Sequence, residues 1–380
     1  MPDIQDQPVS PAENQEKEVS PKTIGASRLA DASSLNKPEE KKPLPKIKYP
    51  PLLWLKTQEL VKEIKKEIQV EVLVYFTQES AKICNEDVDY FFSHVRELPP
   101  ESPLALVLIS SGGEVTAAWR IANVLRNYCQ ELTVIVPSRC ASTATLLALS
   151  AEKILFGPAG YLTAIDSSLT HSLNPRPIPS QPPTNVSVDQ VSRIVKFIEK
   201  HLKKNPGSKT LPEILFEKIH PVVLAELERT SSLSKMTAKN LMKLRRNAPS
   251  EADQNRIADL LNDAYPSHGY PIVLREAQQI GLPAEPTPKV LNPLLWELVK
   301  LYSIISKKET TNFIPSWYHS EGMPVIIEST NKRTFYNYSY DKRLMHHPVG
   351  WVTESDHSRW RSLTPDRQSP GKPIMSEIEL

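Results

Sequence analysis

A regular alternation of short apolar runs with amphipathic segments is the feature that most constrains the fold of this chain. Four short apolar runs predict strands, at residues 69–76, 104–110, 132–137 and 153–157, and the continuous apolar runs at 104–110 and 132–137 predict buried strands. The segments between them repeat apolar residues at helical spacing, as Val115, Ala118 and Trp119 do. Strands that alternate with helices at such short intervals predict a parallel sheet with crossover helices, and therefore the α/β class.

Composition divides the chain into three parts. Residues 1–50 are rich in Pro, Glu, Lys and Ser and nearly free of aromatic residues, so we expect a disordered tail that cannot bury enough apolar surface to fold. Residues 51–305 hold the alternating part and a helical C-terminal half, and we expect them to form one domain. Helical pieces are predicted near 211–229, 234–246, 252–264, 275–282 and 291–305. Residues 306–380 predict an accessory β-hairpin followed by a mobile, Pro-rich tail.

Charge, hydropathy and cysteine content exclude several classes of function. The 46 basic and 44 acidic side chains leave a formal net charge of +2, which gives no electrostatic reason to expect nucleic acid or an anionic membrane as partner. No apolar stretch approaches the roughly 20 residues of a membrane-spanning helix, and the N-terminus lacks a signal-peptide pattern. The three cysteines show neither CxxC spacing nor a nearby histidine cluster. We therefore expect a cytoplasmic protein without a metal ion or an organic cofactor.

The strand at 104–110 leads through Gly112 and Gly113 directly into a predicted helix. Such a turn leaves backbone N–H groups free at a helix N-terminus, where they can bind an anion. The nucleotide-binding patterns GxGxxG and GxxxxGK[ST] are both absent from the sequence. A Gly-Gly pair on its own more simply indicates a tight turn that serves packing alone.

A second turn of the same kind lies one β-unit further along, where small residues surround Ser142 at the start of the next helix. Ser142 can cap that helix with its side chain. It can also be a nucleophile whose oxyanion is met by the N–H of Thr143 and of a glycine in the neighbouring turn. Adjacent parallel strands would bring both helix N-termini to one edge of the sheet, as the second interpretation requires.

These two turns resemble a known superfamily. The segments SSGGEV and RCASTATLLALSAEKILFGPAGYLTAID, about thirty residues apart, are similar to the Clp-protease/crotonase superfamily and most similar to its serine dehydrogenase proteinase group. That group is related to the signal peptide peptidases and the NfeD-type proteases. Downstream, HGYPI and EAQQIGLP also resemble the group, so the likeness covers about residues 60–305. It implies a parallel-sheet superhelix of ββα units, a peptide or protein substrate, and a homo-oligomer.

The resemblance also implies roles for individual residues. Ser142 falls on the nucleophile, and Gly112, Gly113 and Thr143 fall on the oxyanion-binding positions. Asp166 stands where the Clp proteases carry a histidine about one β-unit after the serine. This sequence departs from the family pattern by having STAT where a glycine would follow the nucleophile, and by having serine where a proline would precede the glycines.

The sequence does not identify the group that accepts the proton of Ser142. His171, five residues after Asp166, is the first candidate, and an unidentified lysine is the alternative. Lys196 falls opposite the apolar stripe of its predicted helix and is expected in solvent. His268 matches the family, but a packing or hydrogen-bonding role is favoured for it. Asp166 can orient the base or brace its own turn.

Three hypotheses follow. The first is a serine peptidase that cleaves peptide bonds through Ser142, His171 and Asp166. The second is a catalytically silent, oligomeric scaffold or binding module with the same fold, suggested by the altered STAT turn and the missing base. The third is acyl-CoA chemistry, for which Glu114 is the acid beside the glycine turn, although it more simply stabilises the helix N-terminus.

Overall fold

The computed structural model describes residues 53–166, 168–169, 186–187, 191, 193–194, 220–307, 309–346, 349–369 and 372–378. The expected N-terminal tail, His171 and Lys196 lie outside the described residues. Pro45–Leu380 form one compact unit. Within the described part of this unit, no helix is long and apolar enough to cross a membrane.

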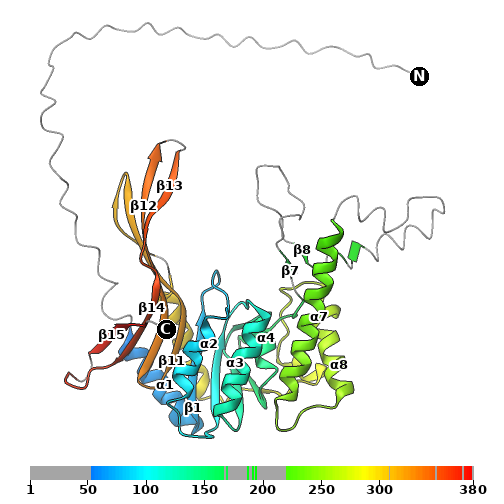
Figure 1. The fold of residues 1–380 in the computed structure, drawn as a ribbon. Helices are drawn as coiled ribbons and strands as arrows, with labels where there is room; N and C mark the ends of the chain where they lie inside the picture. The colour runs from blue at the N-terminus through cyan, green and yellow to red at the C-terminus, as the bar shows by residue number, and fades with distance from the viewer. Residues whose placement is uncertain are drawn as a thin grey trace, which may run out of the picture. The chain divides into compact units, whose positions relative to one another are not determined.

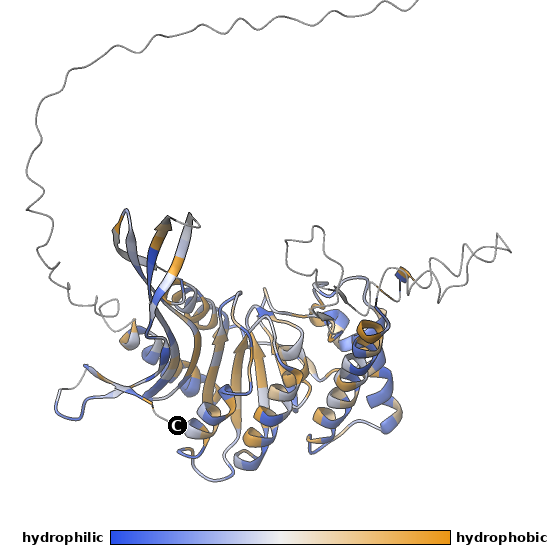
Figure 2. Cartoon of the chain, turned by 45° about the horizontal axis from the view of Figure 1, so that its top comes forward, coloured by the Kyte–Doolittle hydropathy of each residue, from blue (hydrophilic) through white to orange (hydrophobic). Residues whose placement is uncertain are grey.

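The centre of the fold is a parallel sheet, which confirms the predicted α/β class. Its strands are, in spatial order, β1 (Glu71–Thr77), β2 (Leu104–Ile109), β3 (Leu132–Val136), β5 (Lys153–Phe156) and β9 (Ala284–Pro286). Every residue of β2 is buried, because helices cover both faces of the sheet. The hydrophobic residues accordingly concentrate on these strands and on the helix faces turned toward them (Figure 2).

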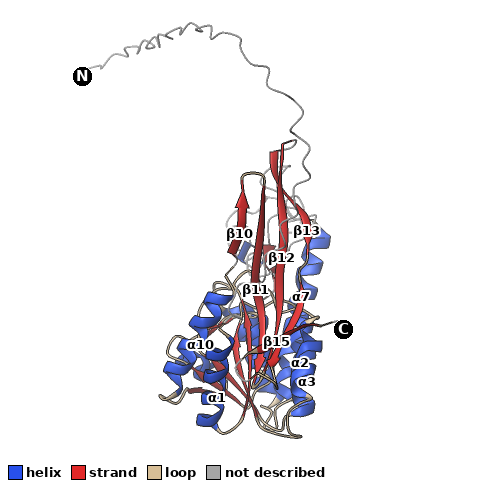
Figure 3. Ribbon diagram, turned by 90° about the vertical axis from the view of Figure 1, so that its left-hand side faces the viewer, coloured by secondary structure: helices blue, strands red, loops and turns tan. Residues whose placement is uncertain are grey.

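Helices α1 (Trp54–Ile68) and α10 (Leu291–Ile305) lie on one face of the sheet, and α2 (Asp87–Val95) and α3 (Val115–Tyr128) on the other (Figure 3). Alternate strand residues supply the two cores: Val72 and Val74 pack with α1 and α10, whereas Leu73 and Tyr75 pack with α2 and α3. The short helix α4 (Thr143–Ala148) is buried within the second of these cores. Figure 1 shows α2, α3 and α4 in succession along that face.

In the described part of the C-terminal helical half, α7 (Pro221–Lys243), α8 (Glu251–Asp259), the π-helical turn η1 (Leu260–Ala264) and α9 (Leu274–Ile280) precede α10. The prediction of two pieces around 211–229 and 234–246 was wrong where it placed a break, since α7 runs through residues 230–233 as one helix. Residues 230–233 are mostly polar, but Ser231 and the adjacent Ser234 are buried. Tertiary packing therefore overrides the weak local propensity of this stretch.

The C-terminal region departs from the predicted accessory hairpin and mobile tail. It forms β10 (Glu309–Ile314), β11 (Trp317–Ser329), β12 (Lys332–His346), β13 (Val349–Asp356), β14 (Arg359–Pro365) and β15 (Pro373–Glu377). The expected hairpin is β11 and β12, but β11 also pairs antiparallel with β1, from Leu73 opposite Ser329 to Thr77 opposite Val325. It thereby continues the central sheet. The expected tail contains β14 and β15, which extend the sheet beyond β12.

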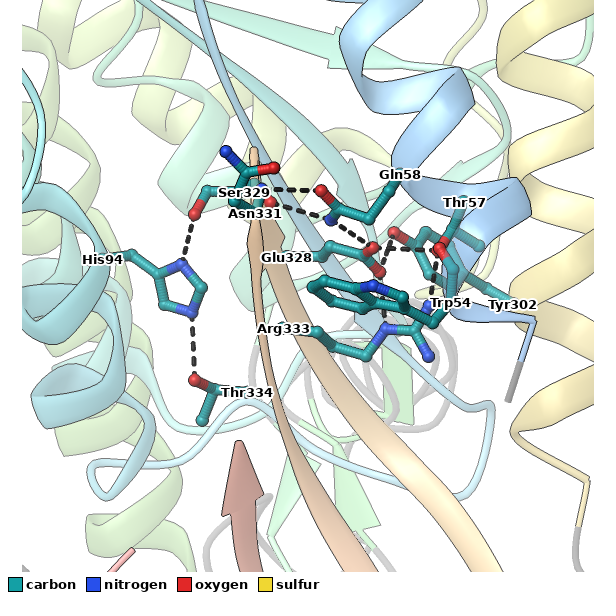
Figure 4. Close-up of polar contacts among 10 residues, drawn as sticks. All are labelled: Trp54, Thr57, Gln58, His94, Tyr302, Glu328, Ser329, Asn331, Arg333 and Thr334. Atoms are coloured by element: carbon teal, nitrogen blue, oxygen red, sulfur yellow. Dashed lines mark hydrogen bonds and ion pairs between the residues drawn. The ribbon is translucent and has the colours of Figure 1, made fainter. Parts of the chain in front are cut away.

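A buried ion pair marks the junction between these C-terminal strands and the N-terminal helix (Figure 4). Arg333 Nε lies 2.7 Å from Glu328 Oε2, and both side chains have 0% exposure. Thr57 and Gln58 of α1 donate hydrogen bonds to Glu328 Oε1, and Tyr302 of α10 donates to Oε2. One carboxylate therefore joins two helices to the β11–β12 hairpin, with its charge paired and its oxygens satisfied.

A buried histidine joins α2 to the same hairpin. The ring nitrogens of His94 lie 2.7 Å from Ser329 Oγ and 3.1 Å from Thr334 Oγ1, as Figure 4 shows. Burial, with a smaller contribution from nearby Lys332, lowers the pKa of His94 to about 3. The ring is therefore neutral in the folded protein, and its role is structural.

Candidate active site

The glycine turn and the serine turn lie side by side, as the sequence predicted. The chain leaves β2 at Ser110, and the chain that follows β3 passes through β4 (Arg139–Cys140) before it reaches Ser142. Ser110 N donates to Arg139 O over 3.0 Å, and Ala141 N donates to Ser110 O over 2.9 Å. These backbone bonds align the start of α3 with the start of α4 at the carboxyl edge of the sheet.

Gly112 is pressed against the start of α4. Its φ is +99°, a region that residues with a side chain rarely adopt. A Cβ at this position would lie 2.8 Å from Ser142 Cβ and 2.9 Å from Thr143 N. The N–H of Gly112 donates to Ser110 Oγ over 3.1 Å. Gly112 thus gives the two turns room to touch, while its own N–H is occupied, in contrast to the oxyanion-binding role expected for it.

Gly113 presents its N–H on the side away from Ile83. The carbonyl of Gly112 accepts a hydrogen bond from Ile83 N over 2.9 Å. Because a trans peptide holds its C=O and N–H in opposite directions, the Gly113 N–H points away from Ile83. A Cβ at Gly113 would lie 2.1 Å from Ile83 O, so only glycine permits this approach. No described residue accepts a hydrogen bond from this N–H or from that of Thr143 in the first turn of α4.

Ser142 has a strained backbone and a hydroxyl that does not cap its helix. Its φ of 54° and ψ of −118° are unusual for a residue with a side chain, and such conformations cost on the order of 1–3 kcal/mol. Ser142 stands at the N-cap position of α4, yet its side chain makes no capping hydrogen bond. The interpretation of Ser142 as a simple helix cap is therefore wrong. A nucleophilic serine held on a strained strand-to-helix turn has this combination of features.

Asp166 and His268 form a hydrogen-bonded pair that the sequence did not predict. His268 Nδ1 lies 2.7 Å from Asp166 Oδ1; the aspartate side chain is 3% exposed and the histidine side chain 40%. The hydrogen bond to Asp166 raises the pKa of His268, against an opposing effect of partial burial. The other oxygen, Asp166 Oδ2, is buried and has no hydrogen-bond partner among the residues that the structure describes.

The pair is anchored to the serine turn through the segment that follows β6 (Tyr161–Leu162). Thr163 Oγ1 accepts a hydrogen bond from Ser142 N over 2.8 Å, and Asp166 follows Thr163 by three residues. Three extended residues span at most about 10 Å, so Asp166 lies near the turn. On the other side, Leu162 and Ile272 exchange backbone hydrogen bonds. That bridge brings the loop carrying His268 to the same place.

The other residues considered from the sequence are two histidines, a lysine and a cysteine. His171 and Lys196 lie outside the described residues, so neither is placed relative to Ser142. His268 was recognised in the HGYPI segment, but nothing local connected it to a carboxylate 102 residues away. Cys140 is fully buried and burial raises its pKa, which makes it unreactive. In the part of the chain that the structure describes, no three His, Cys, Asp or Glu side chains are grouped to hold a metal ion.

A comparison with known protein families matches residues 60–181 to the family described as ClpP-like SDH-type serine proteinase. The matched segment, about a third of the chain, is therefore similar to that family. The match confirms the resemblance inferred from the sequence, and it includes both turns and Asp166. His268 and the C-terminal strands lie beyond the segment that matches the ClpP-like SDH-type model.

Two curated proteins of Methanocaldococcus jannaschii are similar to the chain over a longer range than this ClpP-like segment. The uncharacterized protein MJ0137 is 26% identical over 235 residues, which are 61% of this chain and 70% of that protein. The uncharacterized protein MJ1495 is 20% identical over 237 residues, which are 62% of this chain and 70% of that protein. Among solved structures, a mutant of the 1510-N membrane-bound stomatin-specific protease is matched at 17% identity and a TM-score of 0.32, over 63% of this chain and 87% of that one.

Proposed function

We propose that this protein is a serine peptidase in which Ser142 attacks the carbonyl carbon of a peptide bond. The observation that carries the proposal is the pair of N–H groups on Gly113 and Thr143, which no described residue accepts, beside a strained serine whose hydroxyl does not cap its helix. Acyl transfer requires such donors, already in place where the negative charge of the tetrahedral oxygen develops. A helix start whose only role was packing would have no need of the strained backbone at Ser142.

The Asp166–His268 pair is the group that we propose to accept the proton. With Nδ1–H donated to Asp166, Nε2 of neutral His268 carries the lone pair that can take the proton of the Ser142 hydroxyl. The Ser142 oxygen then bonds to the substrate carbon, and His268 returns the proton to the leaving amine. Water then attacks the acyl-enzyme carbonyl, with His268 accepting the proton of the water and returning it to the Ser142 oxygen as that oxygen leaves. Asp166 stabilises the protonated ring, in keeping with the raised pKa of His268.

Ser142 and His268 do not form a hydrogen bond with each other in the structure. None of the described residues forms a hydrogen bond with the Ser142 hydroxyl. Hydrogen bonds of this kind are often long without substrate and shorten only when substrate binds. This pair therefore replaces His171 as the proposed base, and Asp166 keeps the orienting role that the sequence suggested for it.

The proposal is tested with a fluorophosphonate, which reacts with an activated serine by releasing fluoride. The purified protein and the Ser142→Ala variant are treated with the reagent, and their intact masses are measured. We expect one adduct on the natural protein and none on the variant. Labelling of a His268→Gln variant should be strongly slowed, because the serine loses its proton acceptor. An unlabelled natural protein would favour the silent scaffold of the same fold instead.

The partners are also proposals. The ClpP-like family points to a peptide or protein substrate, and the resemblance to Clp-type proteases suggests a homo-oligomer. A cytoplasmic location stays an expectation from the sequence. Light scattering coupled to size-exclusion chromatography measures the mass in solution, and a mass equal to the 42.8 kDa of one chain would overturn the oligomer.

A further inference from the structure

We propose that Thr163 is a positioning residue for Ser142, whose hydroxyl holds the nucleophile turn in its strained conformation. The inference rests on the proposed function and deepens it, since it names a residue outside the reacting groups. Thr163 is 2% exposed, and its Oγ1 accepts the hydrogen bond of Ser142 N over 2.8 Å. This contact is made by the backbone of the nucleophile, so it acts directly on the φ and ψ of Ser142.

The orientation of the Thr163 hydroxyl is itself determined. Its proton is donated to Ala164 O over 3.1 Å, which leaves an oxygen lone pair facing Ser142 N. The backbone N of Thr163 donates to Thr145 Oγ1 over 3.1 Å, and Thr145 Oγ1 donates to Cys140 O over 2.9 Å. Two threonine side chains thus hold the nucleophile turn at Ser142 and at the residue two positions before it. A strained conformation persists when surrounding contacts over-determine it in this way.

The contact also decides which backbone N–H groups are left for the oxyanion. Ser142 N is occupied by Thr163, whereas the next N–H along the chain, that of Thr143, has no acceptor among the described residues. Thr143 Oγ1 donates to Gly113 O over 2.6 Å, which joins the two turns that carry the free N–H groups. If Thr163 lost its hydroxyl, Ser142 N would be released, and both the serine and the neighbouring N–H would be free to rotate.

Thr163 further couples the nucleophile to the acid–base pair. Asp166 follows it by three residues, and Ile165 between them donates its backbone hydrogen bond to Leu261 O over 2.9 Å. One short segment therefore fixes Ser142 at its start and Asp166 at its end. A shift of this segment would alter the distance from Ser142 to His268 without removing either group.

The test compares the rate of fluorophosphonate labelling, as a function of pH, in the full-length protein and in variants of Thr163. Thr163→Val keeps the shape of the side chain and deletes the acceptor, and we expect the plateau rate to fall about tenfold, the usual effect of one lost hydrogen bond to a buried group. The pH midpoint should not move, because His268 is untouched. Thr163→Ser restores the oxygen and should label within about threefold of the natural protein.

Thr287→Val is the matched control. Thr287 is also buried, and its hydroxyl lies 3.2 Å from Phe156 O and 2.5 Å from Asn292 Oδ1, so the variant loses a buried, hydrogen-bonded threonine hydroxyl at a place that does not contact Ser142. It should label at the natural rate. Thr163→Cys, which differs from Thr163→Ser by sulfur in place of oxygen, covers the case in which the valine variant does not fold, and it should label more slowly than the serine variant.

Labelling of Thr163→Val at the natural rate, or equal rates for the serine and cysteine variants, would overturn the positioning role while leaving the proposed function intact. A moved pH midpoint in Thr163→Val would overturn it as well, because the threonine would then act through His268. If the natural protein itself is not labelled, the proposed function fails, and the positioning role fails with it.

Discussion

Replacing Glu328 by glutamine tests whether the buried ion pair holds the C-terminal strands on the parallel sheet. Glu328 Oε2 lies 2.7 Å from Arg333 Nε, with both side chains at 0% exposure. The same carboxylate accepts hydrogen bonds from Thr57, Gln58 and Tyr302 on two helices. Glutamine has nearly the same shape, but it carries no charge, and one of its two terminal atoms is a donor. The substitution therefore changes the electrostatics without creating a cavity.

The magnitude follows from these contacts. Removing one partner of a buried ion pair costs about 3–5 kcal/mol, because the remaining charge stays in the interior. The amide nitrogen must also face at least one of the donors that now bond to Glu328, and a buried donor left unpaired costs about 1–3 kcal/mol. These costs overlap, so we expect a loss of about 4 kcal/mol from the free energy of unfolding. Natural domains have about 5–15 kcal/mol in total.

The assay is equilibrium unfolding in guanidinium chloride, followed by far-ultraviolet circular dichroism. Glu297→Gln provides the control, because Glu297 pairs with Lys300 on the surface, at 45% and 58% exposure. We expect the control to lose less than about 1 kcal/mol. A loss of less than about 1 kcal/mol for Glu328→Gln as well would refute the argument that this carboxylate joins α1 and α10 to the hairpin.

Three further predictions concern the site and the pH dependence of the protein. Gly113→Ala would place its Cβ 2.1 Å from Ile83 O, so we expect loss of labelling or of folded protein, and unchanged labelling with an unchanged Tm would contradict the geometry. In the natural protein the labelling rate should rise with pH through the raised pKa of His268; Asp166→Asn should move that rise to lower pH, and a rise that stays in place would exclude His268 as the base. His94, with its pKa lowered to about 3, takes up a proton on unfolding, so the protein should lose up to about 1.4 kcal/mol of stability per unit as pH falls from about 6.5 toward 3. His94→Gln should flatten that slope, as measured by unfolding at several pH values.

The parallel sheet could be predicted because a strand that is buried on both faces has a recognisable local sequence pattern. Its residues form a continuous apolar run, and the crossover helices between such runs have their own periodicity. The same local pattern placed Gly113 and Ser142 at neighbouring strand ends, since consecutive parallel strands end at one edge. The local pattern failed within α7, which was predicted as two pieces but is one continuous helix with Ser231 and Ser234 buried.

No local sequence pattern predicted that the C-terminal strands pair with β1. The alternating pattern of a strand predicts that one of its faces is buried, but it does not predict which element covers that face. Val325 and Thr77, which pair in the structure, are far apart in the sequence. An accessory hairpin was therefore as consistent with the pattern as an extension of the central sheet. The Glu328–Arg333 ion pair, which joins the hairpin to α1 and α10, could not be predicted from the sequence, because it forms only when these segments pack together.

For this protein, the sequence by itself determined the α/β class, the first four parallel strands along the chain, and the two turns that carry the glycines and Ser142, because each depends on residues close together in the chain. Only the tertiary structure decided that Ser142 is strained and uncapped, that Gly113 turns its N–H away from Ile83, and that Asp166 meets His268. Those features depend on contacts between residues about twenty to one hundred positions apart. Contacts at such separations are set by how whole elements pack, and no local pattern of residues specifies them.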